Sequence, residues 1–286
     1  MEARAAIKIR LLLESDIASA MRLKDEAGWN QTEADWRRLL LLEPNGCFCA
    51  VKDDLVVGTT TTTTYGNDLA WIGMVLVDQQ HRGEGIATKL MTVALEYLEG
   101  RVQTVKLDAT PQAKAVYAKF GFEVESVIER WSGTGSSTTA NTEARMATDR
   151  NDVRDLLILD RRAFNADRSR LIDKLIEDSS VPPVFGRAPG GALNGYALAR
   201  NGTKADYVGP VVTEDPAQVE TLLDEILSRL SGHRVYVDSN TECSAAVSVL
   251  SDRGFVKERD LFRMRTSGSG LKTSPLVVAI AGPEIG

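Results

Sequence analysis

The chain has 286 residues, more than one average domain needs and enough for two domains of about 100 to 150 residues with a core each. Hydrophobic residues make up 43% and charged residues 26%, which excludes disordered and fibrous classes. With a formal net charge of -6 and a pI of about 5.2, the chain has no basic field, so we expect no nucleic-acid partner and no anionic membrane partner.

The cysteine content and the N-terminal residues indicate the cellular location. Cys47, Cys49 and Cys243 are too few for a disulfide framework, and none has zinc-ligand spacing, so we expect no metal. Cys47 and Cys49 alternate along a predicted strand without a nearby histidine, which favours packing over nucleophilic catalysis. No cleavage-site pattern and no stretch of about 18 apolar residues is found, so the prediction is a cytoplasmic protein without a membrane span.

The first half alternates strand and helix patterns. Thr32 and Asp35 form a capping pair for the second helix, and residues 52–54 turn a hairpin. The expected elements, in chain order, are a strand at 7–11, helices within 14–28 and 32–43, hairpin strands within 47–65, a buried strand at 69–78, a helix at 86–98, a strand at 102–109, a helix at 111–120 and a strand at 122–131.

The second half repeats this order. Ala70-Trp71-Ile72-Gly73 matches Asp206-Tyr207-Val208-Gly209, and Gly121-Phe122 matches Gly254-Phe255. The separation between equivalent residues shortens after the fourth strand, where the first copy has a glycine loop. We therefore predict an α/β fold of two tandem domains, each a mixed sheet flanked by helices: residues 1–131, an exposed linker at 132–142, and a degenerate copy at 143–286.

The glycine loop, HRGEGIATKL at 81–90, lies between a strand and a helix. Such a loop exposes backbone N–H groups at the positive end of the helix dipole, which favours an anion. Gly83 and Gly85 allow a phosphate close to the main chain, and Arg82 adds a cation. Glycines also occur in ordinary turns, so the loop alone does not decide between an anion site and a turn.

The wider context is more specific. Gln80-x-x-Gly83-x-Gly85, preceded by an apolar strand and followed by Ile86-Ala87, resembles the acyl-CoA signature of the GNAT superfamily of N-acyltransferases. The resemblance implies that pantetheine lies along Val75, Leu76 and Val77. It also implies that the pyrophosphate is held by the loop residues Gln80, His81, Arg82, Gly83, Glu84, Gly85, Ile86, Ala87 and Thr88, with His81 towards solvent or the adenosine phosphate.

A narrower resemblance covers nearly the whole chain. EAGWNQTEADW, WIGMVLVD, LDATPQAKAVYAKFGF and AGPEIG are similar to tandem-domain GNAT proteins related to YitH of Bacillus, whose second domain is degenerate. The resemblance implies the fold more securely than the substrate.

The same resemblance assigns the proton chemistry. Tyr117, four residues before Gly121-Phe122, matches the tyrosine that points at the CoA sulfur and is the expected general acid, with core packing as the alternative. Thr110 stands at a CoA contact where the family often has Asn. Leu250 occupies the tyrosine position of the second half, so that half is expected to be structural and to close over the acceptor site.

The sequence leaves the base and the acceptor site open. Asp108 is either the base, directly or through water, or a cap of the helix at Pro111. The segment that covers the acceptor pocket in this fold contains Asp25, Glu26, Trp29 and Asn30, which are candidates for gripping an ammonium group, although a solvated helix face is the alternative for the two acids. Trp71 is either core or pocket wall.

The expected function is an acyl-CoA-dependent N-acyltransferase that moves an acetyl or other short acyl group from acetyl-CoA or another short acyl-CoA to a primary amine of a small molecule. A monomer or homodimer is expected. The alternatives are a non-catalytic acyl-CoA sensor and a protein-lysine acetyltransferase. A carrier protein could also replace CoA as donor.

Overall fold

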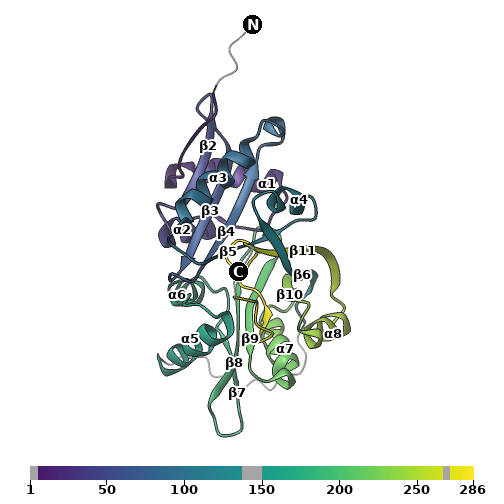
Figure 1. The fold of residues 1–286 in the computed structure, drawn as a ribbon. Coiled ribbons are helices and arrows are strands. Elements are labelled where there is room, and N and C mark those ends of the chain that lie inside the picture. Colours follow the sequence, from purple (N-terminus) through teal and green to yellow (C-terminus); the bar gives the residue numbers. More distant parts are fainter. Residues whose placement is uncertain (1–5, 137–149, 267–270) are drawn as a thin grey trace.

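The computed structural model describes residues 6–136, 150–266 and 271–286 (Figure 1). The first half forms β1 (Lys8–Leu11), α1 (Ile17–Glu26), α2 (Glu33–Leu42), β2 (Cys47–Lys52), β3 (Leu55–Tyr65), β4 (Leu69–Val77), α3 (Ile86–Leu98), β5 (Thr104–Ala109), α4 (Lys114–Ala118) and β6 (Phe122–Thr134). The second half forms α5 (Arg150–Phe164), α6 (Ser169–Glu177), β7 (Val184–Arg187), β8 (Leu193–Arg200), β9 (Asp206–Thr213), α7 (Val219–Arg229), β10 (Arg234–Asn240), α8 (Ser244–Asp252), β11 (Val256–Thr266) and β12 (Val277–Ala279).

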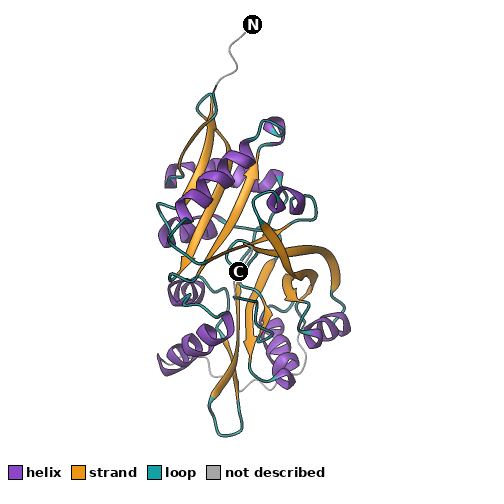
Figure 2. Ribbon diagram, viewed as in Figure 1, coloured by secondary structure: helices purple, strands orange, loops and turns teal. Residues whose placement is uncertain are grey.

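The strands of both halves join one 12-stranded mixed sheet, in the order β1-β2-β3-β4-β5-β11-β6-β10-β12-β9-β8-β7. Figure 2 shows this sheet running through the length of the molecule with helices along it. The mixed α/β class and the two copies of one domain type are confirmed. What the pattern does not predict is that the two sheets are continuous.

The halves exchange their last long strands where the sheets meet. Strand β11 of the second half pairs antiparallel with β5, and β6 of the first half pairs antiparallel with β10. The two exchanged strands also pair with each other over most of their length. Neither half therefore completes its own sheet, and the seam lies beside the strand that carries Asp108.

Alternation along the strands divides the core between the two faces of the sheet. On β2, Cys47 and Cys49 lie in the cluster that also includes residues of α1, α2, α5 and α6, whereas Phe48 and Ala50 lie in the cluster beneath α3. This period of two is that of a strand covered on both sides. Cys47 and Cys49 are fully buried, which agrees with a packing role.

The order of elements in the first half is confirmed, and so is the capping pair, in which Thr32 accepts from the Asp35 amide and Asp35 accepts from the Thr32 amide. The hairpin turns at Asp53 and Asp54, both with positive φ. The helix expected at 111–120 is shorter, because three residues of turn precede Lys114.

The domain limits remain a prediction. Strand β6 continues to Thr134, three residues into the range expected as linker, and residues 137–142 of that range lie outside the described residues. Within the described ranges, no helix has the length and apolar character needed to cross a membrane.

Candidate active site

The candidate site is a cavity at the point where β4 and β5 separate. The two strands pair in parallel only from Leu69 to Trp71 on β4 and from Thr104 to Lys106 on β5. Beyond these residues the strands diverge, and the gap is lined by Ile72, Gly73, Met74, Val75, Leu107, Asp108, Thr110 and Tyr117 from the first half, with Trp29, Gln31 and Arg130. The second half contributes Arg259, Leu261, Pro283 and Glu284.

A bulge in β4 shapes this opening. The register with β3 shifts between Thr59 and Thr61, and Met74 has a φ of 50°. A bulge bends its strand and changes the direction of its side chains, and bulges are frequent beside functional sites. Here Val75 lies in the cavity wall, whereas Leu76 is buried in the core cluster beneath α1 and α2.

The glycine loop follows the same strand and has the geometry of an anion cradle. Gly83 and Gly85 have φ values of 81° and 77°, and a Cβ added to either would meet nothing within 4 Å. The loop main chain is therefore accessible from outside. Gly85 is the N-cap of α3, and the first amide bonded back to it is that of Lys89.

Three amides at the start of α3, those of Ile86, Ala87 and Thr88, have no hydrogen-bond partner within the described parts of the chain. Such N–H groups, with the helix dipole behind them, are suited to a pyrophosphate. Arg82 and Gln80 are exposed beside them, Asp78 fixes the turn by accepting from the Gln80 amide, and a CoA pyrophosphate fits this cradle.

His81 and Glu84 lie on the other side of this loop, in an ion cluster with Lys52. The Lys52 Nζ is 2.9 Å from one Glu84 oxygen, and His81 Nδ1 is 3.3 Å from the other. The cluster ties the loop to the end of β2. His81 thus has a structural contact and does not line the cavity.

Tyr117 lies in the cavity wall on α4 and is 9% exposed. Its ring packs edge-on against Phe122, and its hydroxyl makes no hydrogen bond to the residues that the structure describes. Burial raises the pKa of Tyr117 to about 12. The phenol is therefore protonated at neutral pH. Thr110 also lines the cavity, and its hydroxyl accepts weakly from the Ala113 amide.

Asp108 does not cap the helix after Pro111; its carboxylate instead pairs with Arg263 from β11. Both Asp108 oxygens accept from this guanidinium, at 3.0 and 2.9 Å, and both side chains are almost fully buried. Burial raises the pKa of Asp108, and Arg263 opposes this effect. Of the two roles left open by the sequence, the cap is excluded by the geometry.

The last described residues, 280–286, enter the site from the second half. The Trp71 indole donates to the Pro283 carbonyl at 2.9 Å, and the Tyr65 hydroxyl donates to that of Ile285 at 2.6 Å. A Cβ on Gly73 would lie 2.5 Å from the Glu284 carbonyl oxygen, so only glycine allows this approach. The segment thereby places the Glu284 carboxylate at the cavity.

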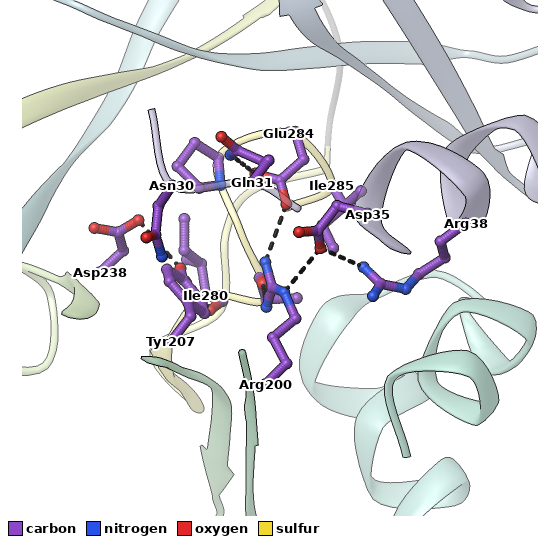
Figure 3. A network of polar contacts seen from close by, with 12 residues as sticks. Asn30, Gln31, Asp35, Arg38, Arg200, Tyr207, Asp238, Ile280, Glu284 and Ile285 are labelled. Atoms are coloured by element: carbon purple, nitrogen blue, oxygen red, sulfur yellow. Dashed lines mark hydrogen bonds and ion pairs between the residues drawn. The ribbon is translucent and has the colours of Figure 1, made fainter. Parts of the chain in front are cut away.

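Glu284 belongs to a buried network that joins the halves (Figure 3). Arg200 donates to Glu284 at 3.0 Å and to Asp35 at 3.1 Å, and Gln31 donates to the other Glu284 oxygen at 2.8 Å. Burial raises the pKa of Glu284, against the effect of Arg200. Burial acts on Asp35 in the same direction, but Arg200 and Arg38 outweigh it, and the pKa of Asp35 is lowered.

Of the residues expected to grip the acceptor, only Trp29 lines the cavity. Asn30 lies one residue away and bonds to the main chain of Lys204 and Ala205, which fastens the two halves together. Asp25 pairs with Lys24 and is mostly exposed, and Glu26 pairs with Arg22. Neither acid reaches the cavity, because both lie on the solvent side of α1.

Trp71 is 1% exposed and belongs to the core rather than to the cavity lining. Its ring lies under the Arg263 guanidinium, 4.6 Å from the ring centroid. Of the two places open to Trp71, core and pocket wall, it takes the core, and its indole holds the 280–286 segment.

Three charged cavity residues were not found from the sequence: Arg130, Arg259 and Glu284. Only the quoted AGPEIG stretch gave a signal for Glu284, and that signal was a resemblance without a role. The two arginines occur in alternating strand patterns that do not separate a cavity residue from a surface residue. Within the described ranges, no group of three His, Cys, Asp or Glu side chains is arranged to hold a metal.

In the second half, the position equivalent to the glycine loop is closed. Strand β9 ends at Thr213, and Glu214-Asp215-Pro216 leads into α7 without a glycine, with the Asp215 side chain capping the turn. Leu250, at the place of Tyr117, is fully buried. Within the described parts of the two halves, the cradle and the tyrosine therefore occur in the first half alone.

Comparison with known proteins identifies the domain type. Residues 13–122 match the model of the acetyltransferase (GNAT) family, and residues 156–275 match an acetyltransferase (GNAT) domain. The chain is 25% identical to the uncharacterised N-acetyltransferase YitH of Bacillus subtilis over 86% of its length and 87% of that protein. It is 21% identical to the holothin acyltransferase of a Pseudoalteromonas species over 90% of its length and 87% of that protein.

Solved structures of other proteins share this fold. A protein of Pyrococcus horikoshii described as an acetyltransferase superposes with a TM-score of 0.83 at 21% identity, covering 98% of this chain and 96% of its own. A GCN5-related N-acetyltransferase of Sphaerobacter thermophilus gives 0.67 at 15% identity, over 91% and 95% of the two chains. With two matched domains, a cavity at the strand separation and an open glycine cradle, this chain is a tandem-domain member of the GNAT acetyltransferase family.

Proposed function

We propose that the protein transfers a short acyl group, acetyl above all, from CoA directly to a primary amine of a small molecule, in the cavity between β4 and β5. The observation that carries this proposal is that one cavity joins Tyr117 and Asp108 to a wall made by the second half. That wall favours a small acceptor over a peptide, which would need an open groove.

The first half would hold the donor. The loop from Gln80 to Thr88 would bind the pyrophosphate through its main chain and Arg82, and the β4 residues Val75 to Val77, which have no β5 partner, would lie along the pantetheine. Bound there, acyl-CoA supplies a thioester carbonyl carbon to the acceptor. Thr110, which lines the cavity, would be a further contact on this path.

The chemistry forms one N–C bond and breaks one C–S bond. Starting from an ammonium and a thioester, the products are an amide, the CoA thiol and one proton. We assign Asp108 as the group that takes the ammonium proton, directly or through water, and Tyr117 as the donor to the leaving sulfur. The second proton lost by nitrogen returns Tyr117 to its neutral form through solvent. Two carboxylates, Asp108 and Glu284, line the cavity in which the amine would lie.

Tyr117→Phe tests this assignment. We expect turnover to fall by about 100-fold or more, because the general acid is lost, while affinity for CoA stays within about twofold. Tyr97→Phe is the matched control, since its hydroxyl bonds to Glu43 away from the cavity. Unchanged turnover in Tyr117→Phe would contradict the role of Tyr117 as acid.

The acceptor class is tested by incubating the protein with acetyl-CoA and a panel of amines, amino acids and a lysine peptide, followed by mass spectrometry of the products. Acylated small amines support the proposal. Acylation of the peptide alone would favour a protein-lysine acetyltransferase, and a protein that binds acetyl-CoA without acylating any acceptor would favour a sensor.

A further inference from the structure

Each carboxylate at or near the cavity is paired with an arginine. Asp108 pairs with Arg263, and Glu284 pairs with Arg200. Asp238, beneath the seam, accepts two bonds from Arg130 at 2.7 and 2.5 Å and a third from the Tyr207 hydroxyl. Each of these three carboxylates therefore has an arginine partner other than Arg259.

Arg259 is the cavity arginine that remains. It lines the cavity on β11, directly opposite Arg130 in the strand register, and at the end of a bulge that begins at Lys257. Its Nε is buried without a hydrogen-bond partner, and it forms no ion pair with any residue that the structure describes. Burial and the neighbouring Arg130 both lower the pKa of Arg259.

Arg259 as a whole is partly buried, and the charges of Asp238 and Glu258 act on it only without direct pairing among the described residues. A partly buried cation without a paired carboxylate is costly to keep, and a guanidinium has a planar set of donors that matches a carboxylate. Arg130, the other arginine that lines the cavity, is already paired with Asp238, and pairing Arg259 as well would add stability. A ligand that brings the missing anion relieves this cost when it binds. Arg259, Leu261 and Arg263 alternate along β11 and therefore lie on the same face of the strand. Leu261 also lines the cavity and Arg263 pairs with Asp108, so this face of β11 is the one next to the cavity.

We propose that Arg259 is an anion subsite of the acceptor pocket, so that the acceptor is an amine that also carries a carboxylate, as an amino acid does. This inference rests on the proposed N-acyltransferase function and deepens it. The amine would lie near Asp108 and Glu284 in the first part of the cavity, and the carboxylate would pair with Arg259 at the seam. The second half would then select the substrate that the first half acylates.

The same chemistry could come from the donor, as the free carboxylate of a dicarboxylic acyl group. Two arms distinguish the sources. In one arm, amino acids are compared with their carboxamides, using acetyl-CoA as donor. In the other, succinyl-CoA is compared with acetyl-CoA, using the amino-acid carboxamides as acceptors. A preference for the acid in the first arm assigns the anion to the acceptor, whereas a preference for succinyl-CoA in the second assigns it to the donor and overturns the proposal.

Arg259→Gln is the decisive variant. We expect kcat/KM for the amino acids to fall by about 10-fold or more, as for a lost charge-assisted hydrogen bond, with no comparable change for the carboxamides. Arg259→Lys should recover part of the loss. Lys257→Gln removes an equal charge from the same strand outside the cavity and is the matched control.

A second measurement needs no turnover. The thermal shift of the wild-type protein on adding N-acetylated amino acids, the products, should exceed that of Arg259→Gln, with CoA present in both. Equal shifts, or an equal loss of kcat/KM for acids and carboxamides, would overturn the inference. If Arg259→Gln still acylates uncharged amines, the proposed function stands even where the anion subsite fails. If the wild-type protein acylates no acceptor, the proposed function fails, and the thermal shift alone then tests the anion subsite.

Discussion

Asp108 shows how one residue can have a structural and a chemical role at once. Its carboxylate neutralises the buried Arg263 and also faces the cavity. Asp108→Asn removes both roles together. We expect a loss of stability of about 3–5 kcal/mol, because Arg263 is left as an unpaired buried charge, together with a fall in turnover, as measured by urea unfolding and by product formation.

The double variant Asp108→Asn/Arg263→Gln separates the two roles. Removing both charges should restore much of the stability, since no unpaired charge remains. Turnover should stay low, because a carboxamide cannot accept the amine proton. Recovery of turnover with stability would show that Asp108 acts only as a counter-ion.

At the scale of elements, how well the sequence predicts a feature depends on how local its cause is. The glycine loop, the strand before it and the helix after it are contiguous, so their chemistry can be inferred from one stretch. Arg259 and Glu284 reach the same cavity from far along the chain. No periodicity reports such a contact, because alternation fixes the face of a strand and not its neighbour.

The same limit applies to the acceptor segment. Asp25 and Glu26 were expected near the substrate because they share with Trp29 and Asn30 the segment that covers the acceptor pocket in this fold, yet both lie on the solvent side of α1. The strand exchange could not be predicted from the sequence either. Strand β6 corresponds to the strand expected at 122–131, and β11 follows Gly254-Phe255, which repeats Gly121-Phe122. Nothing in their sequences chooses between the edge of their own half and that of the other.

The strand exchange makes a prediction about fragments. Residues 1–136 and 143–286, expressed separately, should each be insoluble or self-associated, because β5 and β10 lose their antiparallel neighbours and leave open edges. Expressed together they should form a one-to-one complex, visible by size-exclusion chromatography with light scattering. A monomeric, cooperatively folded 1–136 fragment would contradict the exchange.

For the whole molecule, the two halves form one buried unit at the seam. Arg200 of the second half lies between Asp35 of the first half and Glu284 of the last segment, and Asn30 is bonded to Ala205. Such contacts are expected to make the two GNAT copies unfold together. The pH dependence of that single transition then reports on groups in both copies.

Alkaline pH provides such a test. Burial raises the pKa of the Cys47 thiol from 9.0 to about 12, and that of Tyr117 from 10.0 to about 12. In both cases the protonated form is favoured by folding. The resulting stability is complete below the unfolded pKa, near 9 for Cys47, and declines as the pH rises towards 12, because the unfolded chain loses its proton first.

We therefore expect the free energy of unfolding, from urea titrations at pH 8 to 10.5, to fall above pH 9, by up to about 1.4 kcal/mol per pH unit for Cys47 alone. Cys47→Ala should reduce this slope and leave the part due to Cys49, whose pKa burial raises to about 11. Leu39→Ala, in the same core cluster, lowers stability without removing a titrating group and should keep the wild-type slope. An equal slope in Cys47→Ala and in Leu39→Ala would mean that the thiol is not the group that titrates, because both variants remove core volume and only one removes the proton.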